Sequence, residues 1–223
     1  MSKKIVVAVD GTAGSGKSAT LKKVATQIGY TFIDTGLMYR AFTLLGLNKK
    51  VDFKNSQELI NLIPDFDYVV KKDKVFLNGQ DVSNKLASPE ILANINDITP
   101  IPEIRELMVQ KQRALAQTNQ NEGIIMIGRD ITSVVLPTAD LKIYLDASLD
   151  ARAQRRYEET RNEKTNNTDL AFIKKALAER DASDKNRLVG PLVLTNNTWY
   201  LDNSTMSLDQ TVDTIIAKIK QME

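Results

Sequence analysis

Residues 8–23 read AVDGTAGSGKSATLKK, and this stretch predicts the fold of the chain. A short β-branched run, IVVAV at residues 5–9, comes just before it, and an amphipathic helical pattern follows as far as Gly29. A strand, a glycine-rich loop and a helix form the setting in which G-x-x-x-x-G-K-[ST] binds phosphate groups. The pattern is matched at the required spacing by Gly11, Gly16, Lys17 and Ser18. The stretch therefore predicts a nucleoside triphosphate site after the first strand.

The glycines of this loop let successive backbone N–H groups approach a polyphosphate, and the following helix adds the partial positive charge of its N-terminus. Lys17 is predicted to hold the β- and γ-phosphates, and Ser18 to ligate Mg²⁺. The predicted ATP-binding residues are Gly11, Thr12, Ala13, Gly14, Ser15, Gly16, Lys17, Ser18 and Ala19.

Beyond the loop, buried strands alternate with helices, which predicts an α/β fold with a parallel, doubly wound sheet and helices on both faces. Further strands are expected at YTFID (30–34), GIIMIG (123–128) and LKIYLD (141–146), and helices over Met38–Leu47 and from Ser207 onward. Trp199 lies in the apolar run TWYL, where a core position on the last strand is favoured over a platform for base stacking.

The region from about Asn48 to Pro102 interrupts this alternation. Three short runs separated by Lys-Asp and Asn-Gly turns predict a small antiparallel sheet. We expect one domain, with a core of about residues 1–47 and 103–223 and an insertion at about 48–102. The polar residues 158–168 predict a mobile loop between two helices, within a short lid of about 155–168.

Composition limits the class of protein. The 223 residues, 42% of them hydrophobic, suffice for a sizeable core, and 30 basic against 28 acidic residues indicate neither nucleic acid nor membrane as a partner. The absence of Cys excludes disulfides, and the absence of His removes the commonest general base. The N-terminus has too few apolar residues for a signal or a membrane span, so a cytoplasmic location is expected.

Two classes of phosphate-loop protein fit poorly. A regulatory GTPase needs a D-x-x-G switch and an N-K-x-D guanine reader, and neither pattern occurs in the sequence. A mechanical ATPase needs an acidic residue at a strand end to help place Mg²⁺ and water, whereas IIMIG ends without one. Both observations favour a small phosphotransferase.

Clustered arginines predict a second anion site. Arg129 and Asp130 follow a buried strand, where ligands bind in open α/β sheets, and should face the same crevice as Lys17. Further candidates are Arg40, Arg105 and the group Arg180, Asp184 and Arg187, which is expected on successive helical turns. Arg152, Arg155 and Arg156 fall on one helical face before the polar loop, and Arg161 lies in that loop, as expected of a lid that closes arginines onto transferring phosphates.

Four stretches together resemble the motifs of bacterial cytidylate kinases, in the same order and over nearly the whole chain. They are VAVDGTAGSGKSA (7–19), DTGLMYRA (34–41), GRDITSVVLPTADLKIYLDAS (128–148) and RDASDKNRLVGPL (180–192). The resemblance implies transfer of the γ-phosphoryl group of ATP, with Mg²⁺, to CMP or dCMP. It also implies that the insertion binds the monophosphate and that the protein is a monomer.

The resemblance assigns roles to matching positions. It implies that Arg40, Arg129 and Arg187 hold the CMP phosphate, that Tyr39, Arg180 and Asp184 meet the ribose, and that Arg105 and Asp130 read the base, with Thr35 nearby. A carboxylate can accept from the exocyclic amine of cytosine, and uracil has a carbonyl there, so Asp130 should favour C over U. The catalytic set is Lys17, Arg155, Arg156 and Arg161.

Two positions depart from the family pattern. Asn96 stands where the family has a small hydroxyl residue near the base, and Ile127 stands where many members have Asp or Glu before GRD. If that missing carboxylate orders the Mg²⁺ shell, Asp34 is a candidate to replace it. Two alternatives stay open at this point: a kinase of another small acceptor such as UMP, and a nucleotide-binding module without catalysis.

Overall fold

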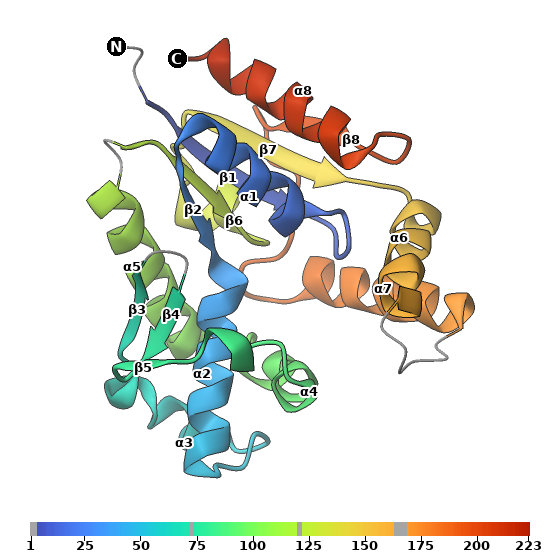
Figure 1. Cartoon of the computed structure of the whole chain (residues 1–223). Coiled ribbons are helices and arrows are strands. Elements are labelled where there is room, and N and C mark those ends of the chain that lie inside the picture. Colours follow the sequence, from blue (N-terminus) through green and yellow to red (C-terminus); the bar gives the residue numbers. More distant parts are fainter. Residues whose placement is uncertain (1–3, 72–73, 120–121, 163–168) are drawn as a thin grey trace. The chain divides into compact units, whose positions relative to one another are not determined.

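The computed structural model in Figure 1 describes residues 4–71, 74–119, 122–162 and 169–223, and only the backbone of residues 160–162. The chain forms two compact units. The first contains the chain up to Ile33 and from Leu115 onward, and the second is Asp34–Ala114. Helix α5 (Pro102–Asn119) runs from the second unit into the first.

The first unit is built on a five-stranded sheet with the order β2-β6-β1-β7-β8. β1 pairs in parallel with β6 and β7, so that Val7 lies opposite Ile125 and Leu141, and β7 pairs in parallel with β8. The strands are β1 (Val6–Gly11), β2 (Thr31–Asp34), β6 (Ile124–Ile127), β7 (Leu141–Asp146) and β8 (Trp199–Asp202). The sheet confirms the predicted α/β class and the strands expected at 30–34, 123–128 and 141–146.

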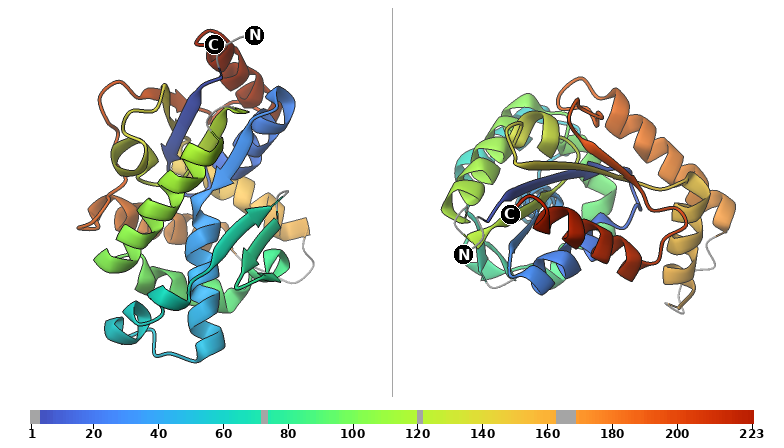
Figure 2. Two further views of the ribbon diagram at one scale, coloured as in Figure 1. Left: turned by 90° about the vertical axis from the view of Figure 1, so that its left-hand side faces the viewer. Right: turned by 90° about the horizontal axis from the view of Figure 1, so that it is seen from above.

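Helices lie on both faces of this sheet. Seen from above in Figure 2, α1 and α8 lie on one side and α7 on the other. Valines 7 and 9 of β1 face α1 and α8 in the core, because alternate residues of a strand point to the same face. Trp199 packs against this core, as predicted. The helices are α1 (Lys17–Ile28), α6 (Leu149–Asn162), α7 (Leu170–Asn186) and α8 (Leu208–Lys220).

The helix ends agree with their sequence signals. Gly29 ends α1 in the left-handed conformation, with φ of 68°. Ser207 caps α8, and its side chain and that of Gln210 form a reciprocal capping box. The helix expected over Met38–Leu47 is α2 (Thr35–Lys49), which starts three residues earlier because Asp34 caps it by accepting a hydrogen bond from the N–H of Gly36.

The second unit contains α2 and an antiparallel sheet in the order β3-β4-β5, so the three predicted runs are strands. The Asn-Gly turn has positive φ at Asn78 and Gly79, whereas the Lys-Asp turn at residues 72–73 lies outside the described residues. The elements are β3 (Tyr68–Lys71), β4 (Lys74–Leu77), β5 (Gln80–Asp81), α3 (Ser56–Ile60), α4 (Pro89–Ile98) and the 3₁₀ turns Ile63–Asp65 and Ser83–Lys85.

This unit extends beyond the insertion expected at 48–102. It begins at Asp34 and ends at Ala114, because α2 packs on α4 and β4 of the same unit. The assignment of the unit to the monophosphate stays a prediction. Across the described ranges, no helix is both long and apolar enough to cross a bilayer.

Candidate functional site

The phosphate loop, residues 11–18, follows β1 and leads into α1. Gly14 and Gly16 have φ of 75° and 84°, values at which residues with a side chain are strained. Gly11 has φ of 150°, and a Cβ atom there would lie 1.9 Å from the carbonyl oxygen of Leu145 on the neighbouring β7. All three glycines of the motif are therefore required by backbone shape or by a neighbouring strand.

Lys17 lies inside this loop. Its Nζ donates to the carbonyl oxygens of Gly11 (2.7 Å) and Thr12 (2.6 Å) and to the hydroxyl of Ser15 (3.3 Å). Burial lowers the pKa of the Lys17 ammonium well below its ordinary value, and the positive charge of Arg129 lowers it further. Lys17 and Arg129 therefore lie close enough to interact electrostatically. That they face one crevice stays a prediction.

Arg152 and Asp181 hold the backbone of Ala13 within the loop. The N–H of Ala13 donates to Asp181 Oδ1 at 3.0 Å, and its carbonyl accepts from Arg152 Nη1 at 2.8 Å. Arg152 Nη1 also donates to Asp181 Oδ2 at 2.7 Å. Placing Arg152 with the lid arginines was wrong: its side chain turns into the unit, where this carboxylate neutralises its charge. The amide of Ala13 is thus directed at a protein carboxylate.

Arg155 is directed at the segment after β8. Its guanidinium donates to Asn203 Oδ1 (3.0 Å) and to the Asn203 carbonyl (2.6 Å), and Asn203 Nδ2 donates to the carbonyl of Ser15 (3.1 Å). Arg156 is exposed and pairs with Glu159 on the same helix. Arg161 belongs by its backbone to the last turn of α6, not to a loop, and its side chain lies outside the described part. The catalytic role of the three arginines stays a prediction.

The turn after β6, residues 128–135, carries Arg129 and Asp130 and ends in a short π-helix, Ile131–Val135. Buried Asp10, on β1, accepts hydrogen bonds from the N–H groups of Ile131 and Thr132 at 2.8 Å each and from the Thr132 hydroxyl at 2.7 Å. Burial raises the pKa of Asp10, and these hydrogen bonds oppose the rise. Asp10 thereby fixes where the π-helix begins, directly after Arg129 and Asp130.

Four predicted residues from two distant segments form an arginine–aspartate cluster: Arg129, Asp130, Asp184 and Arg187. Arg129 Nε donates to Asp184 Oδ2 at 2.7 Å. Arg187 lies with Nη1 3.9 Å from Asp184 Oδ1 and Nη2 3.9 Å from Asp130 Oδ1. Arg187 was expected on a helical turn but caps the end of α7 in an extended conformation. Arg180, on α7, is near enough for its charge to lower the pKa of Lys17.

The remaining candidates belong to the second unit. Thr35 begins α2 and is buried, and Arg40 on the same helix reaches the carbonyl of Leu86 at 3.4 Å. Arg105 is buried and donates to the carbonyl of Thr99 at 3.3 Å, at the junction of α4 and α5. The last two are Tyr39 on α2 and Asn96, which is exposed on α4.

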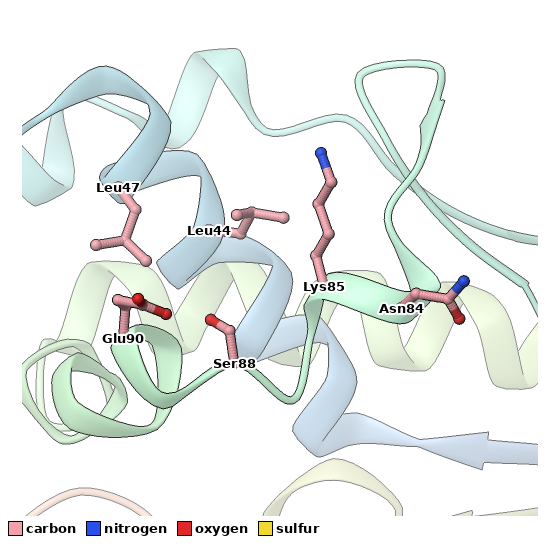
Figure 3. Close-up of a pocket in the computed structure, with 6 residues that line it drawn as sticks. All are labelled: Leu44, Leu47, Asn84, Lys85, Ser88 and Glu90. Carbon is pink, nitrogen blue, oxygen red and sulfur yellow. The ribbon is translucent and has the colours of Figure 1, made fainter.

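A surface pocket of about 490 Å³ lies elsewhere in this unit and is shown in Figure 3. Leu47 of α2 points toward Glu90 at the start of α4 there, and the Lys85 side chain extends away from Ser88 and Glu90. None of the predicted site residues lines this pocket, so it is not the candidate nucleotide site.

The residue predicted to ligate Mg²⁺ is Ser18. Within the described residues, no group of three or more acidic side chains could hold a metal ion. Ser18 is exposed on the first turn of α1, and Ile127 is fully buried at the end of β6. This environment fits Mg²⁺, which commonly binds through substrate phosphates and water with one or two protein ligands.

Sequence reasoning missed several residues that shape the site. Asp10 had a recognisable signal, because a carboxylate at the end of an apolar strand needs hydrogen-bond donors. Asp181 and Asn203 had none, since each stands among other polar residues. Asp146 also escaped notice; it accepts from the Thr12 hydroxyl at 2.6 Å and so ties the loop to β7.

Comparison with known proteins gives one consistent family. The sequence model described as cytidylate kinase matches residues 7–221. The chain is 50% identical to the cytidylate kinase of Mycoplasma capricolum, over 99% of this chain and 98% of that protein. It is 48% identical to that of Mesoplasma florum, over 100% and 99%. A crystal structure of an uncharacterized protein from Eubacterium ventriosum has the same fold, with a TM-score of 0.56, 16% identity and coverage of 98% and 99%.

Proposed function

The chain belongs to the cytidylate kinase family, and from this premise we propose that it transfers the γ-phosphoryl group of ATP to CMP or dCMP, giving ADP and CDP or dCDP. The observation that carries the proposal is the arrangement of the first unit. Lys17 of the phosphate loop lies within electrostatic reach of Arg129 and Arg180, which the sequence assigned to the acceptor. A donor lysine close to acceptor arginines is what a phosphotransferase requires.

The donor contacts are assigned to the phosphate loop. Lys17 would meet the β- and γ-phosphates, and the N–H groups at the start of α1 would bind phosphate oxygens. Ala13 is excepted, because its N–H donates to Asp181. In this reading the remaining members of the predicted ATP set, Gly11, Thr12, Gly14, Ser15, Gly16, Ser18 and Ala19, line the donor site.

The acceptor contacts keep the assignments made from the sequence. Arg40, Arg129 and Arg187 would bind the CMP phosphate, and Tyr39, Arg180 and Asp184 the ribose. Asp130 would accept a hydrogen bond from the exocyclic amine of cytosine. Asp130 Oδ1 lies 3.9 Å from Arg187 Nη2, so the residue assigned to the base is next to one assigned to the phosphate. The remaining base contacts are assigned to Thr35, Asn96 and Arg105.

The reaction needs no general base. The second pKa of a phosphate monoester is about 6, so CMP is mostly a dianion at neutral pH. One of its phosphate oxygens attacks the γ-phosphorus of ATP, the bond from that phosphorus to the β-phosphate oxygen breaks, and ADP leaves with the electron pair. The protein aligns the two phosphates and offsets their charge with Lys17 and arginines. The chain has no His, in accord with this chemistry.

Mg²⁺ bound to ATP would supply further neutralisation of phosphate charge. Ser18 is the residue proposed to ligate it, with Asp34 as a second candidate. The cytoplasmic location and the monomeric state likewise remain predictions. A normal Mg²⁺ dependence in Asp34→Ala would reject Asp34 as a ligand.

An assay of diphosphate formation from ATP and Mg²⁺ with CMP, dCMP, UMP and AMP side by side tests the proposal. We expect strong turnover of CMP and dCMP and weak turnover of UMP. Turnover of none of the four would contradict the acceptor assignment and favour a binding module. Asp130→Ala should reduce the preference for CMP over UMP more than it reduces maximal rate; equal losses with both acceptors would make Asp130 structural.

A further inference from the structure

We propose that the buried pair formed by Arg152 and Asp181 positions the phosphate loop for ATP, so that losing the pair impairs the use of ATP far more than the use of CMP. The inference rests on the proposed function and deepens it. The sequence grouped Arg152 with the lid arginines, but its side chain is buried against Asp181, and Asp181 was in no predicted set. Both are therefore positioning residues.

The two side chains and one loop residue form a closed ring of hydrogen bonds. Asp181 accepts from the N–H of Ala13 through Oδ1 and from Arg152 through Oδ2, and the same Arg152 nitrogen donates to the Ala13 carbonyl. Arg152 Nε donates further to the carbonyl of Ala147 at 2.8 Å, which fixes the plane of the guanidinium. Both polar groups of the Ala13 backbone are thereby bound to α6 and α7.

Stability alone does not explain a pair in this place. Arg152 is 5% exposed and Asp181 8%, and removing two charges from water costs about as much as their attraction returns. An apolar pair of similar volume would leave the N–H and C=O of Ala13 without partners, and buried backbone groups require them. The pair therefore selects one backbone conformation of the loop.

Packing next to Ala13 leaves little room for another arrangement. A Cβ atom on Gly14 would lie 3.3 Å from Leu177 Cδ2 and 3.6 Å from Arg152 Cβ. Ala13 and Gly14 are thus seated directly against α6 and α7. Loss of either charged side chain would free this part of the loop, which precedes the amides assigned to the phosphates.

Helix α7 also contacts a residue assigned to the phosphate acceptor, Arg129. Asp181 holds Ala13, and Asp184, three residues later and hence on the same helix face, holds Arg129. One helix face therefore sets the distance between the phosphate loop and the turn after β6. Because Asp184 and Arg129 keep their contact when Asp181 changes, we expect the acceptor arginine to stay in place.

The test measures steady-state KM for ATP and for CMP in Asp181→Ala, Asp181→Asn and Arg152→Met. We expect KM for ATP to rise about tenfold in Asp181→Ala and Arg152→Met, equivalent to about 1.4 kcal/mol of binding, and KM for CMP to stay within about twofold. Asp181→Asn keeps an oxygen for the N–H of Ala13 and should lie between wild type and Asp181→Ala. The matched control is the exposed ion pair of Lys174 and Asp150, which also joins α6 to α7; Asp150→Asn should change neither KM.

Equal rises in both KM values, or an unchanged KM for ATP in a folded Asp181→Ala protein, would overturn the proposal. If Asp181→Ala or Arg152→Met does not fold, Asp181→Asn decides by the same criterion. Calorimetric titration with ATP alone separates this test from the proposed function, since it needs no acceptor. A wild-type affinity for ATP in the folded variants would contradict the positioning role whatever the acceptor is.

Discussion

The phosphate loop and the turn after β6 lie at the carboxyl ends of neighbouring strands, and a buried aspartate holds each of them by different means. Asp181 reaches the loop from 168 residues away and is paired with the charge of Arg152. Asp10 reaches the turn from 121 residues away and accepts three hydrogen bonds from uncharged donors. The loop is thus held by a buried ion pair, and the turn by hydrogen bonds from uncharged donors.

This difference matters for how each region responds to change. The carboxylate of Asp181 faces the guanidinium of Arg152, whereas burial, and to a smaller extent the negative charge of Asp130, raises the pKa of Asp10. An amide in place of Asp181 can still accept from Ala13. An amide in place of Asp10 would turn an N–H₂ group toward at least one of its donors.

The largest effect is expected from Gly11→Ala. It distorts the backbone of the phosphate loop at a position where the hydrogen bonds of Asp181 and Asp10 cannot compensate. The added Cβ would lie 1.9 Å from the backbone oxygen of Leu145, and the strand cannot move away without losing its pairing. We expect a loss of about 3 kcal/mol or more in the free energy of unfolding, measured by urea denaturation.

Gly29→Ala is the control for this prediction. Gly29 also has positive φ, but nothing lies within 4 Å of an added Cβ. Strain alone should then cost about 1 to 2 kcal/mol. Equal losses in the two variants would mean that the contact with Leu145 is unimportant.

Lys17→Ala should have the next largest effect and separates the chemistry of the loop from its shape. We expect turnover to fall at least about a thousandfold, because the charge on the transferring phosphate loses its lysine. CMP binding should stay largely intact, since Lys17 is assigned to the donor. The melting temperature should fall by at most about a few degrees, because loss of the hydrogen bonds to the Gly11 and Thr12 carbonyls is offset by relief of the burial penalty on the ammonium. Rate, CMP titration and melting curve check the three parts, and an unchanged rate would refute the phosphate-loop assignment.

Asp10→Asn breaks the anchor of the turn and should affect the acceptor side. Loss of at least one of the three hydrogen bonds should shift Arg129 and Asp130, so we expect KM for CMP to rise about tenfold and KM for ATP to change less. This is the reverse of the pattern expected for Asp181→Ala. Asp140→Asn is the matched control, because Asp140 accepts from the N–H of Val6 at the other end of β1. A larger rise in KM for ATP than for CMP would contradict the proposal that Asp10 supports CMP binding and Asp181 supports ATP binding.

The smallest effect concerns pH. The pKa of Asp10 is raised above 3.8, so between pH 3.8 and its value in the folded protein the folded state binds more protons than the unfolded state. The stability contributed by the protonated group is present below pH 3.8 and is lost as pH rises through the folded pKa. Asp10→Asn has no titrating group at this position, so the position adds no pH dependence to its stability. The difference in unfolding free energy between wild type and Asp10→Asn should therefore shrink as pH rises from 3.8 to the folded pKa. Urea denaturation of both proteins from pH 3.5 to 7 measures this difference. A difference that grows with pH would contradict the raised pKa of Asp10.

Several features of the fold could be predicted because they depend on local patterns. The alternation of apolar strands and amphipathic helices indicated the sheet, and the pair Ser207 and Gln210 indicated where α8 starts. The boundary of the second unit could not be predicted in this way. Helix α2 is apolar on most sides, so its sequence does not show which elements it packs on. Packing against α4 and β4 places it in that unit.

The candidate site, too, could be predicted from the sequence only in part. Arg129, and separately the group with Asp184 and Arg187, were predicted as parts of an anion site, and the structure joins them by ion pairs. Arg152 was grouped with Arg155 and Arg156 from its helical spacing, yet it points into the unit. Spacing along one helix does not reveal which face a second helix will cover, and Asp181 comes from that second helix.

By itself, the amino-acid sequence determined that a phosphate loop follows a buried strand, that the fold is α/β, and to which family the motifs belong. Only the tertiary structure decided which carboxylates are buried and what they hold. Asp10 and Asp181 have the same side chain, but one meets backbone N–H groups and the other a guanidinium. The physical reason is that the cost of burying a charge depends on its neighbours in space, and chain folding brings those neighbours from more than a hundred residues away.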